Sequence, residues 1–324
     1  MSKSLLERIR GEAYALLKQE RSEEALEKAL ELFVLAPQNA ESYLLAAEIA
    51  EAAGACEDAF SFVNQGLHQK PEDLGLLLKK ASILLDDFEE LEEAFTVLKH
   101  MEALVDKSKT QELNKELCHD MALLLCDCYR LQNDFKNAFY YAKKAHDYLP
   151  KSENARLTYA NAQFELGNYE EALNLLGDVG SYDNKSDYYW LKAQIQCASA
   201  DFAGSEELFQ KAHKSDKSRY HSPVRISQNE FLEAVTAAYH SFPKEIQEKL
   251  ATYSFEIAEI VPRSYIENSA AKLSPLALTL LIQAEESDVP SLIFFQKNFE
   301  NMASSPSDIK KIAASAILHE VQQS

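Results

Sequence analysis

The residues closest to a recognisable chemistry are His319 and Glu320, near the end of the chain. A zinc-hydrolase helix carries two histidines four residues apart, because that spacing places both imidazoles on one helical face, and a glutamate beside the first serves as general base. The position four residues after His319 is Gln323. A catalytic zinc needs about three protein ligands and an open position. We therefore expect no catalytic residue, and we interpret His319 and Glu320 either as remnants of such a motif or as an ordinary surface pair at a helix end.

The five cysteines also predict no metal or redox centre. Cys126 and Cys128 lie two residues apart in a predicted helix, so their side chains point in different directions and cannot chelate one ion together. The other three (Cys56, Cys118, Cys197) fall in separate predicted helices, an arrangement typical of reduced thiols in a cytoplasmic protein. Only 8 glycines are present, scattered through turns, so no phosphate-binding loop is expected. We expect no cofactor.

Charge and hydropathy exclude further classes of function. The formal net charge is −19, which argues against nucleic-acid binding, since contacts to a phosphate backbone need basic stripes. The first twenty residues carry charges throughout and do not read as a signal peptide, and no run of eighteen apolar residues could span a membrane. These features predict a cytoplasmic protein without membrane contact. The acidity, concentrated before Ser222, fits either a basic protein partner or simple solubility.

The elements that hold these residues follow a repeat. Alanines occur at near-constant spacing before a bulky residue, with steps of 34, 35, 44 and 34, at Ala25, Ala59, Ala94, Ala138 and Ala172. A proline follows twelve residues after three of them, at Pro37, Pro71 and Pro150. A period near 34 with a small residue where two helices cross is typical of a helical solenoid. The longer step implies about ten extra residues in a turn or a helix extension, at residues 106–115.

The phrase GNYEEAL at residues 167–173 resembles the start of the second helix of a tetratricopeptide repeat, and earlier copies read RSEEALEKAL, CEDAFSFVNQGL, LEEAFTVLKHM and FKNAFYYAKKAHDYLP. A sixth copy has Ser205 at the alanine position. The resemblance covers about residues 4–218 and implies about six repeats that bind another protein. Small residues at Ala47, Ser82, Cys126, Ala160 and Ala193 would let paired helices approach closely.

The same resemblance implies that the first helix of each repeat lines an inner groove. Carrying the register over predicts these binding residues: Glu48, Asp86, Asp127, Asn154, Asn161, Phe164 and Trp190. The acidic members favour a basic, partly apolar segment of a partner, with Phe164 and Trp190 as anchors. Only Lys79 and Arg130 supply positive charge on this face, which argues against the acidic C-terminal tails that some family members grip. Ordinary solvated positions are the alternative for these residues.

After Lys217 the repeat ends, and SRYHSPVRISQ reads as a linker. The remaining residues predict a helix over residues 228–239, strands over 255–260 and 292–295, and a final helix that begins after an N-cap at Ser307. This order resembles the small zincin-like domain of a bacterial metallopeptidase family, degenerate at its HExxH motif. A purely helical cap is the other interpretation. Either version would cover the apolar end of the solenoid.

Together these features predict a mainly α protein, with a solenoid over residues 1–220 and a small α+β domain over 226–324. We expect an interaction scaffold or adaptor that binds a partner segment in an acidic groove and is not an enzyme. The alternative is a zinc metallopeptidase whose repeats recruit substrate.

Overall fold

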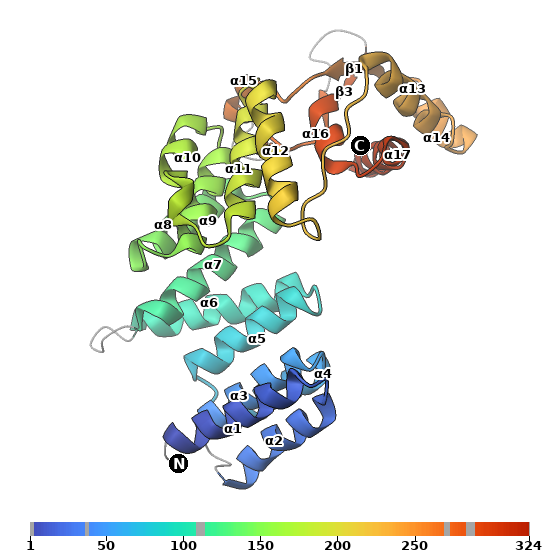
Figure 1. The fold of residues 1–324 in the computed structure, drawn as a ribbon. Coiled ribbons are helices and arrows are strands. Elements are labelled where there is room, and N and C mark those ends of the chain that lie inside the picture. The colour runs from blue at the N-terminus through green and yellow to red at the C-terminus, as the bar shows by residue number, and fades with distance from the viewer. Residues whose placement is uncertain (1–2, 36–38, 108–113, 269–272, 283–288, 324) are drawn as a thin grey trace. The chain divides into compact units, whose positions relative to one another are not determined.

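The computed structural model describes residues 3–35, 39–107, 114–268, 273–282 and 289–323 (Figure 1). The chain forms two compact units. The first unit comprises Met1–Gln132 and Tyr140–Pro150, and the second comprises Asn133–Phe139 and Lys151–Ser324. The sequence predicts one domain that ends at residue 220 and another that starts at residue 226. This division differs from the two compact units, and it stays a prediction.

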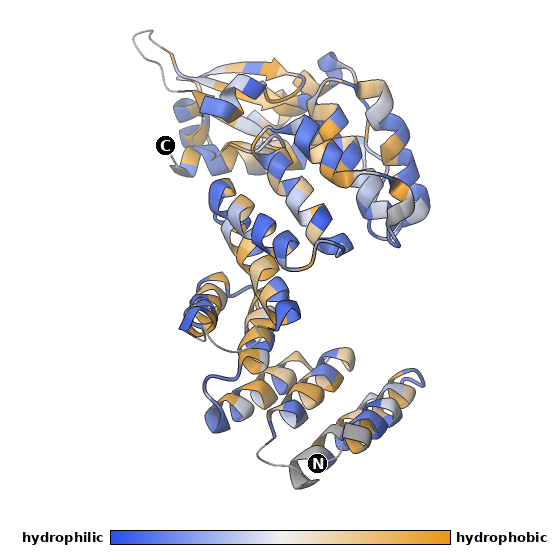
Figure 2. Ribbon diagram, turned by 90° about the vertical axis from the view of Figure 1, so that its left-hand side faces the viewer, coloured by the Kyte–Doolittle hydropathy of each residue, from blue (hydrophilic) through white to orange (hydrophobic). Residues whose placement is uncertain are grey.

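The first unit consists of antiparallel helix pairs. Its helices are α1 (Lys3–Leu17), α2 (Ser22–Leu35), α3 (Ala40–Ala52), α4 (Cys56–Gln69), α5 (Leu74–Asp86), α6 (Leu91–Lys107), α7 (Lys115–Leu131) and most of α8 (Phe135–Tyr148). Hydrophobic and hydrophilic residues are interspersed along these helices (Figure 2), as expected for amphipathic helices with one apolar face. Helices α6 and α7 have 17 residues each, against 13 and 14 in α3 and α4. Part of the predicted insertion therefore extends both helices, and residues 108–113 lie outside the described part.

The second unit continues the helix pairs and adds the C-terminal segment. The pairs are α9 (Glu153–Glu165) with α10 (Tyr169–Leu176), and α11 (Lys185–Ala198) with α12 (Phe202–Ser215), with a 3-10 turn η1 (Val179–Ser181) between them. The C-terminal elements are α13 (Gln228–Tyr239), α14 (Lys244–Leu250), β1 (Ser254–Ala258), α15 (Arg263–Asn268), β2 (Thr279–Ile282), β3 (Ser291–Phe295), α16 (Gln296–Met302) and α17 (Pro306–Gln323).

The small residue of each predicted repeat is buried where its two helices cross. All five alanines and Ser205 are at most 1% exposed, which confirms the repeat and its spacing. Helices α4 and α8 end two residues before Pro71 and Pro150, while Pro37 lies outside the described residues. The prediction for Ser82 is wrong by one residue. Ala81 is fully buried at that crossing, and the Ser82 hydroxyl instead donates to Asp86.

Each repeat turns between its helices through one residue in the left-handed region. These residues lie five positions before the small residue of each second helix: Glu20, Gly54, Glu89, Asn133, Gly167 and Ala200. Two are glycines, for which a positive φ has no steric cost, and asparagine also tolerates this region; the glutamates and the alanine are strained by about 1 kcal/mol or more. The tight turn is therefore imposed by the packing of the helix pair and not by glycine.

The C-terminal strands form a sheet in the order β1-β3-β2, with β1 parallel and β2 antiparallel to β3. Both predicted strands are confirmed, which excludes a purely helical cap. Alternate residues of β3 enter two different cores. Leu292 and Phe294 pack with α13, α16 and α17, whereas Ile293 and Phe295 pack with side chains of the last two repeats. The sheet therefore covers the end of the solenoid with one face and forms its own small core with the other.

The helices at the two ends of the C-terminal segment begin in different ways. Helix α13 spans the predicted residues, and Ser227 caps it in a capping box with Glu230. The predicted N-cap at Ser307 is wrong, because α17 already starts at Pro306; the Asp308 N–H instead donates to the Ser305 carbonyl. Proline suits this first helical position because it has no N–H to satisfy.

Candidate functional site

The three predicted carboxylates of the first unit lie on the first helices of consecutive repeats, and each has a neighbour. Glu48 on α3 lies 3.3 Å from Arg10. Asp86 at the end of α5 accepts a hydrogen bond of 3.0 Å from Ser82, and Asp127 on α7 lies 3.5 Å from Arg130. The further pair of Lys79 with Glu51 joins α5 to α3. Cations therefore offset part of the predicted acidity.

Asp86 and Asp127 nevertheless belong to one electrostatic neighbourhood. Desolvation raises the pKa of Asp127, the Arg130 guanidinium opposes this shift, and the charge of Asp86 adds to it. The Asp127 side chain is still 52% exposed. The charge of Asp86 therefore acts on Asp127, and the face around these two carboxylates is acidic although Arg130 lies beside it. Asp120, about two turns earlier on α7, is also exposed, and desolvation raises its pKa too.

In the second unit the predicted residues have three different environments. Asn154, on α9, is exposed, and Asn161, two turns later, is half-buried. The prediction for Phe164 as a binding anchor is wrong, because this ring is fully buried. It contacts Tyr169, with ring centroids 5.7 Å apart, inside the core shared with the sheet. The sequence register could not fully reveal this, because the core that contains Phe164 also includes residues of the C-terminal segment, such as Ile293 and Phe295.

Trp190 is accessible and lies at the edge of a cavity. Its indole packs edge-on against Phe209 and stacks on Tyr220, with centroids 4.9 and 4.8 Å away. The cavity beside it measures about 420 Å³, and the opposite side is formed by residues of α16 and of the segment before β2. Of the two predicted anchors, only Trp190 can therefore contact a ligand.

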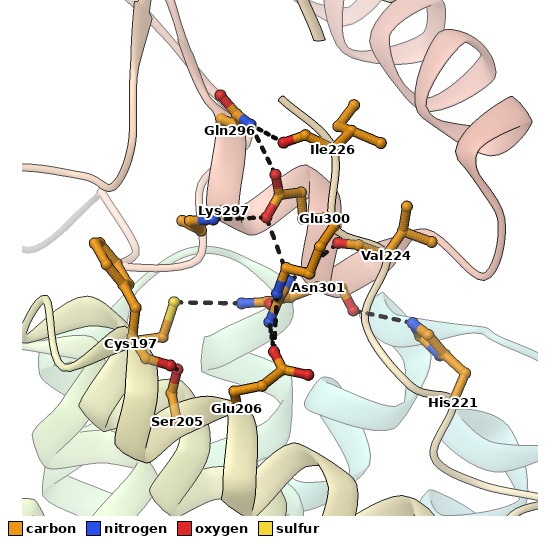
Figure 3. Close-up of polar contacts among 12 residues, drawn as sticks. Cys197, Ser205, Glu206, His221, Val224, Ile226, Gln296, Lys297, Glu300 and Asn301 are labelled. Atoms are coloured by element: carbon orange, nitrogen blue, oxygen red, sulfur yellow. Dashed lines mark hydrogen bonds and ion pairs between the residues drawn. The ribbon is translucent and has the colours of Figure 1, made fainter. Parts of the chain in front are cut away.

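Next to this cavity, a network of charged and polar groups joins α12 to the C-terminal segment (Figure 3). Glu300 on α16 is fully buried and accepts hydrogen bonds from Gln296 at 2.7 Å and Lys297 at 2.9 Å. Arg225 lies 3.4 Å from Glu300 and 2.8 Å from Glu206 of α12. A buried carboxylate is tolerated only when its charge is paired and its oxygens are hydrogen-bonded, as they are here.

The segment that the sequence predicts as a linker takes part in this network. The Val224 N–H donates to the Glu300 carbonyl at 2.9 Å, and the Ile226 carbonyl accepts from Gln296 at 3.0 Å. His221 Nε2 lies 3.0 Å from the Asn301 carbonyl. Proline and polar residues suggested an exposed connection, but its backbone is bonded along α16. Nothing local in the sequence indicates this, since the partners are about seventy to eighty residues away.

His319 and Glu320 lie near the end of α17 and do not form a zinc site. His319 is exposed, and Glu320 accepts a hydrogen bond of 2.8 Å from Thr279 of β2. In the described part of the chain, no three His, Cys, Asp or Glu side chains are grouped so that they could share a metal ion. The donor set does not fit zinc, because the second histidine of the motif is Gln323. The cysteines are free thiols, and burial raises the pKa of Cys128 to about 12.

Comparisons with known proteins agree with this architecture. A family model described as tetratricopeptide repeat matches residues 129–195. Many solved structures are similar, among them the following three. PilF of Pseudomonas aeruginosa is 12% identical over 66% of this chain and 92% of its own, with a TM-score of 0.53. PilW, described as a widely conserved type IV pilus biogenesis factor, is 16% identical over 66% and 94%, with a TM-score of 0.52. A tetratricopeptide repeat protein from Parabacteroides merdae is 14% identical over 65% and 78%, with a TM-score of 0.48.

At these identities the structural likeness shows the fold alone. Residues 129–195 match the tetratricopeptide-repeat family model, and proteins built from such repeats generally bind other proteins or peptides. No curated protein matches the chain. None of the helices in the described ranges combines the length and hydropathy that a membrane-spanning helix requires.

Proposed function

We propose that this protein is an interaction scaffold whose first unit binds a basic, partly apolar segment of a partner protein. The observation that carries the proposal is the neighbourhood of Asp86 and Asp127, two exposed carboxylates on the first helices of consecutive repeats. Lysine or arginine side chains of the partner would pair with them, and the rigid helix pairs would lower the cost of ordering the segment.

Charge reversal on this face tests the proposal. An exposed ion pair contributes about 0.5–1 kcal/mol, and reversing its sign adds a repulsion of similar size. The double variant Glu48→Lys with Asp127→Lys is therefore expected to weaken binding by about 2 kcal/mol, or roughly thirtyfold in Kd. Added salt should weaken the wild-type complex and, because it also screens the repulsion in the variant, reduce the difference in affinity between the two.

The assay measures binding by the fluorescence anisotropy of a labelled peptide in which four lysines alternate with leucines. The comparison peptide has glutamate in place of each lysine. The matched control is Glu27→Lys with Asp106→Lys, the same charge change on the second helices α2 and α6. Equal binding of the lysine peptide by the wild type and by the Glu48 and Asp127 variant would rule the acidic face out. An equal loss in the control would show that only net charge matters.

The remaining predictions belong to this proposal. We infer that the C-terminal segment is a non-catalytic domain that covers the repeats, resembles a zincin and functions in the cytoplasm. The alternative, a zinc metallopeptidase, has only His319 and Glu320 in its favour. Stoichiometric zinc in the purified protein, lost on replacing His319 by alanine, would reverse this choice.

A further inference from the structure

The cavity beside Trp190 is a second feature that the acidic face does not explain. It is enclosed by α11, α16, His221 and the segment before β2, all within the second unit. Its apolar lining comes from Trp190, Leu276, Leu278 and Met302. Its polar lining comes from Gln194, His221, Asn298 and Asn301, so no lysine, arginine, aspartate or glutamate contributes. Such a site suits an uncharged apolar group.

The wall that carries Trp190 is fixed before any ligand arrives. The Tyr220 ring stacked on the indole donates its hydroxyl to Asp187 at 2.5 Å, and Arg219 also lies 3.0 Å from Asp187. His213 Nδ1 lies 2.7 Å from the Tyr220 carbonyl. Because these contacts hold the aromatic wall in place, a ligand that enters the cavity has little ordering of the protein to overcome.

Polar atoms with spare hydrogen-bonding capacity surround the apolar lining. The Asn298 side-chain amide donates to the carbonyls of Pro275 and Ala277, at 2.9 and 2.7 Å, which fixes its orientation. Its Oδ1 accepts no hydrogen bond within the described ranges, although the residue is only 7% exposed. The Gln194 amide and the Trp190 Nε1–H likewise have no hydrogen-bond partner in that part of the chain. None of these atoms is among the buried, unsatisfied ones of the described residues, so solvent reaches them and a ligand group that binds them replaces a hydrogen bond to water.

We propose that this cavity binds an uncharged aromatic side chain of a partner polypeptide together with its adjoining peptide groups. The aromatic ring fills the space between Trp190 and the leucines. The peptide N–H donates to Asn298 Oδ1, and a peptide carbonyl accepts from Gln194 or Trp190. A peptide supplies both kinds of group on either side of the ring, which a hydrocarbon does not. The inference rests on the proposed function, since it assigns a second part of the same partner, but its test does not use the acidic face.

Trp190 is the chain's one tryptophan, so its fluorescence reports on this cavity alone. The probe is N-acetyl-phenylalanine methylamide, excited with the protein at a wavelength that tyrosine does not absorb. At about 0.3 kcal/mol per non-hydrogen atom, its expected Kd is about 0.3 mM. We expect a saturable change in Trp190 emission with this probe and none with the corresponding lysine derivative.

Two variants locate the site. Met302 is 58% exposed at the cavity, so the Met302→Glu variant should fold normally. It should bind the phenylalanine probe more than tenfold more weakly, because the substitution places a charge in the apolar entrance. Leu232→Glu is the matched control, because Leu232 is similarly exposed on α13 and does not line the cavity. The double variant of Glu48 and Asp127 should bind the probe as the wild type does, so this test and that of the acidic face can fail separately.

Several results would overturn the inference. These are no emission change with the phenylalanine probe, an equal change with the lysine derivative, or full binding by Met302→Glu. An equal affinity for benzyl alcohol, which has no amide, would overturn the assignment to a peptide and leave a site for small aromatic molecules.

Discussion

Replacing Glu300 by glutamine tests whether the buried ionic network holds the C-terminal segment on the repeats. The substitution keeps the shape of the side chain and removes the negative charge that pairs with Lys297 (Figure 3) and with Arg225. Breaking a fully buried pair costs about 3–5 kcal/mol. Here the partners are 19% and 32% exposed, and Arg225 retains Glu206 and Asn301. Water therefore recovers part of the loss, and we expect about 2–3 kcal/mol of destabilisation.

Urea unfolding followed by Trp190 emission measures this effect, because the indole lies in the same unit as Glu300. A loss of this size should lower the urea midpoint by about 1 M. The matched control is Glu267→Gln, which removes a pair with Arg263 of 2.9 Å whose side chains are both more than half exposed. That change should cost less than about 0.5 kcal/mol. If the two variants unfold at the same urea concentration, the network does not hold the segment in place.

Three further outcomes follow from individual residues. Ala200→Gly should stabilise the second unit by about 0.5 kcal/mol, because relief of the strained φ of 63° exceeds the added entropy of the unfolded chain. Ala198→Gly, at the end of α11, should instead destabilise this unit, and thermal unfolding of both variants measures the difference. Tyr169→Phe should be neutral or stabilising at pH 7, since the buried hydroxyl has no partner in the described part of the chain. Burial raises the pKa of Tyr169 to about 12, so the wild type should lose stability between about pH 10 and 12, and the variant should lose less. Iodoacetamide should alkylate Cys56 alone in the native protein, because the other thiols are buried, and mass spectrometry after partial unfolding should show more adducts.

The sequence predicts those parts of the fold that depend on contacts between neighbouring helices. The buried alanines and the ends of α4 and α8 follow from a repeat in which each helix packs on the next, so every copy carries the same pattern. The left-handed residue of each turn is part of the same repeat, but its residue type does not predict it. At four of the six positions, among them Glu89 and Ala200, the residue is not glycine, and packing supplies the strain energy that the residue type does not reveal.

Candidate binding residues are harder to predict, for two physical reasons. An error of one residue in the register of α5 assigns Ser82 to the helix crossing, where Ala81 lies, and the Ser82 hydroxyl instead faces Asp86. Phe164 and Trp190 look alike in sequence, as large aromatics on first helices. The structure distinguishes them, because Phe164 lies in a core that the repeats share with the C-terminal segment, whereas Trp190 lies beside a cavity. Such long-range coverage has no local pattern.

Strand β3 explains why the C-terminal segment and the last repeats should behave as one body. A strand with one buried face alternates apolar and polar residues, whereas Leu292 to Phe295 are apolar without interruption and are all buried. One side of this run completes the core around Phe164, and the other completes the core around Phe231. Removing β3 would therefore expose both cores at once. The sequence pattern of the repeats ends near residue 217, but we expect the last repeats to unfold together with the C-terminal segment as one cooperative unit.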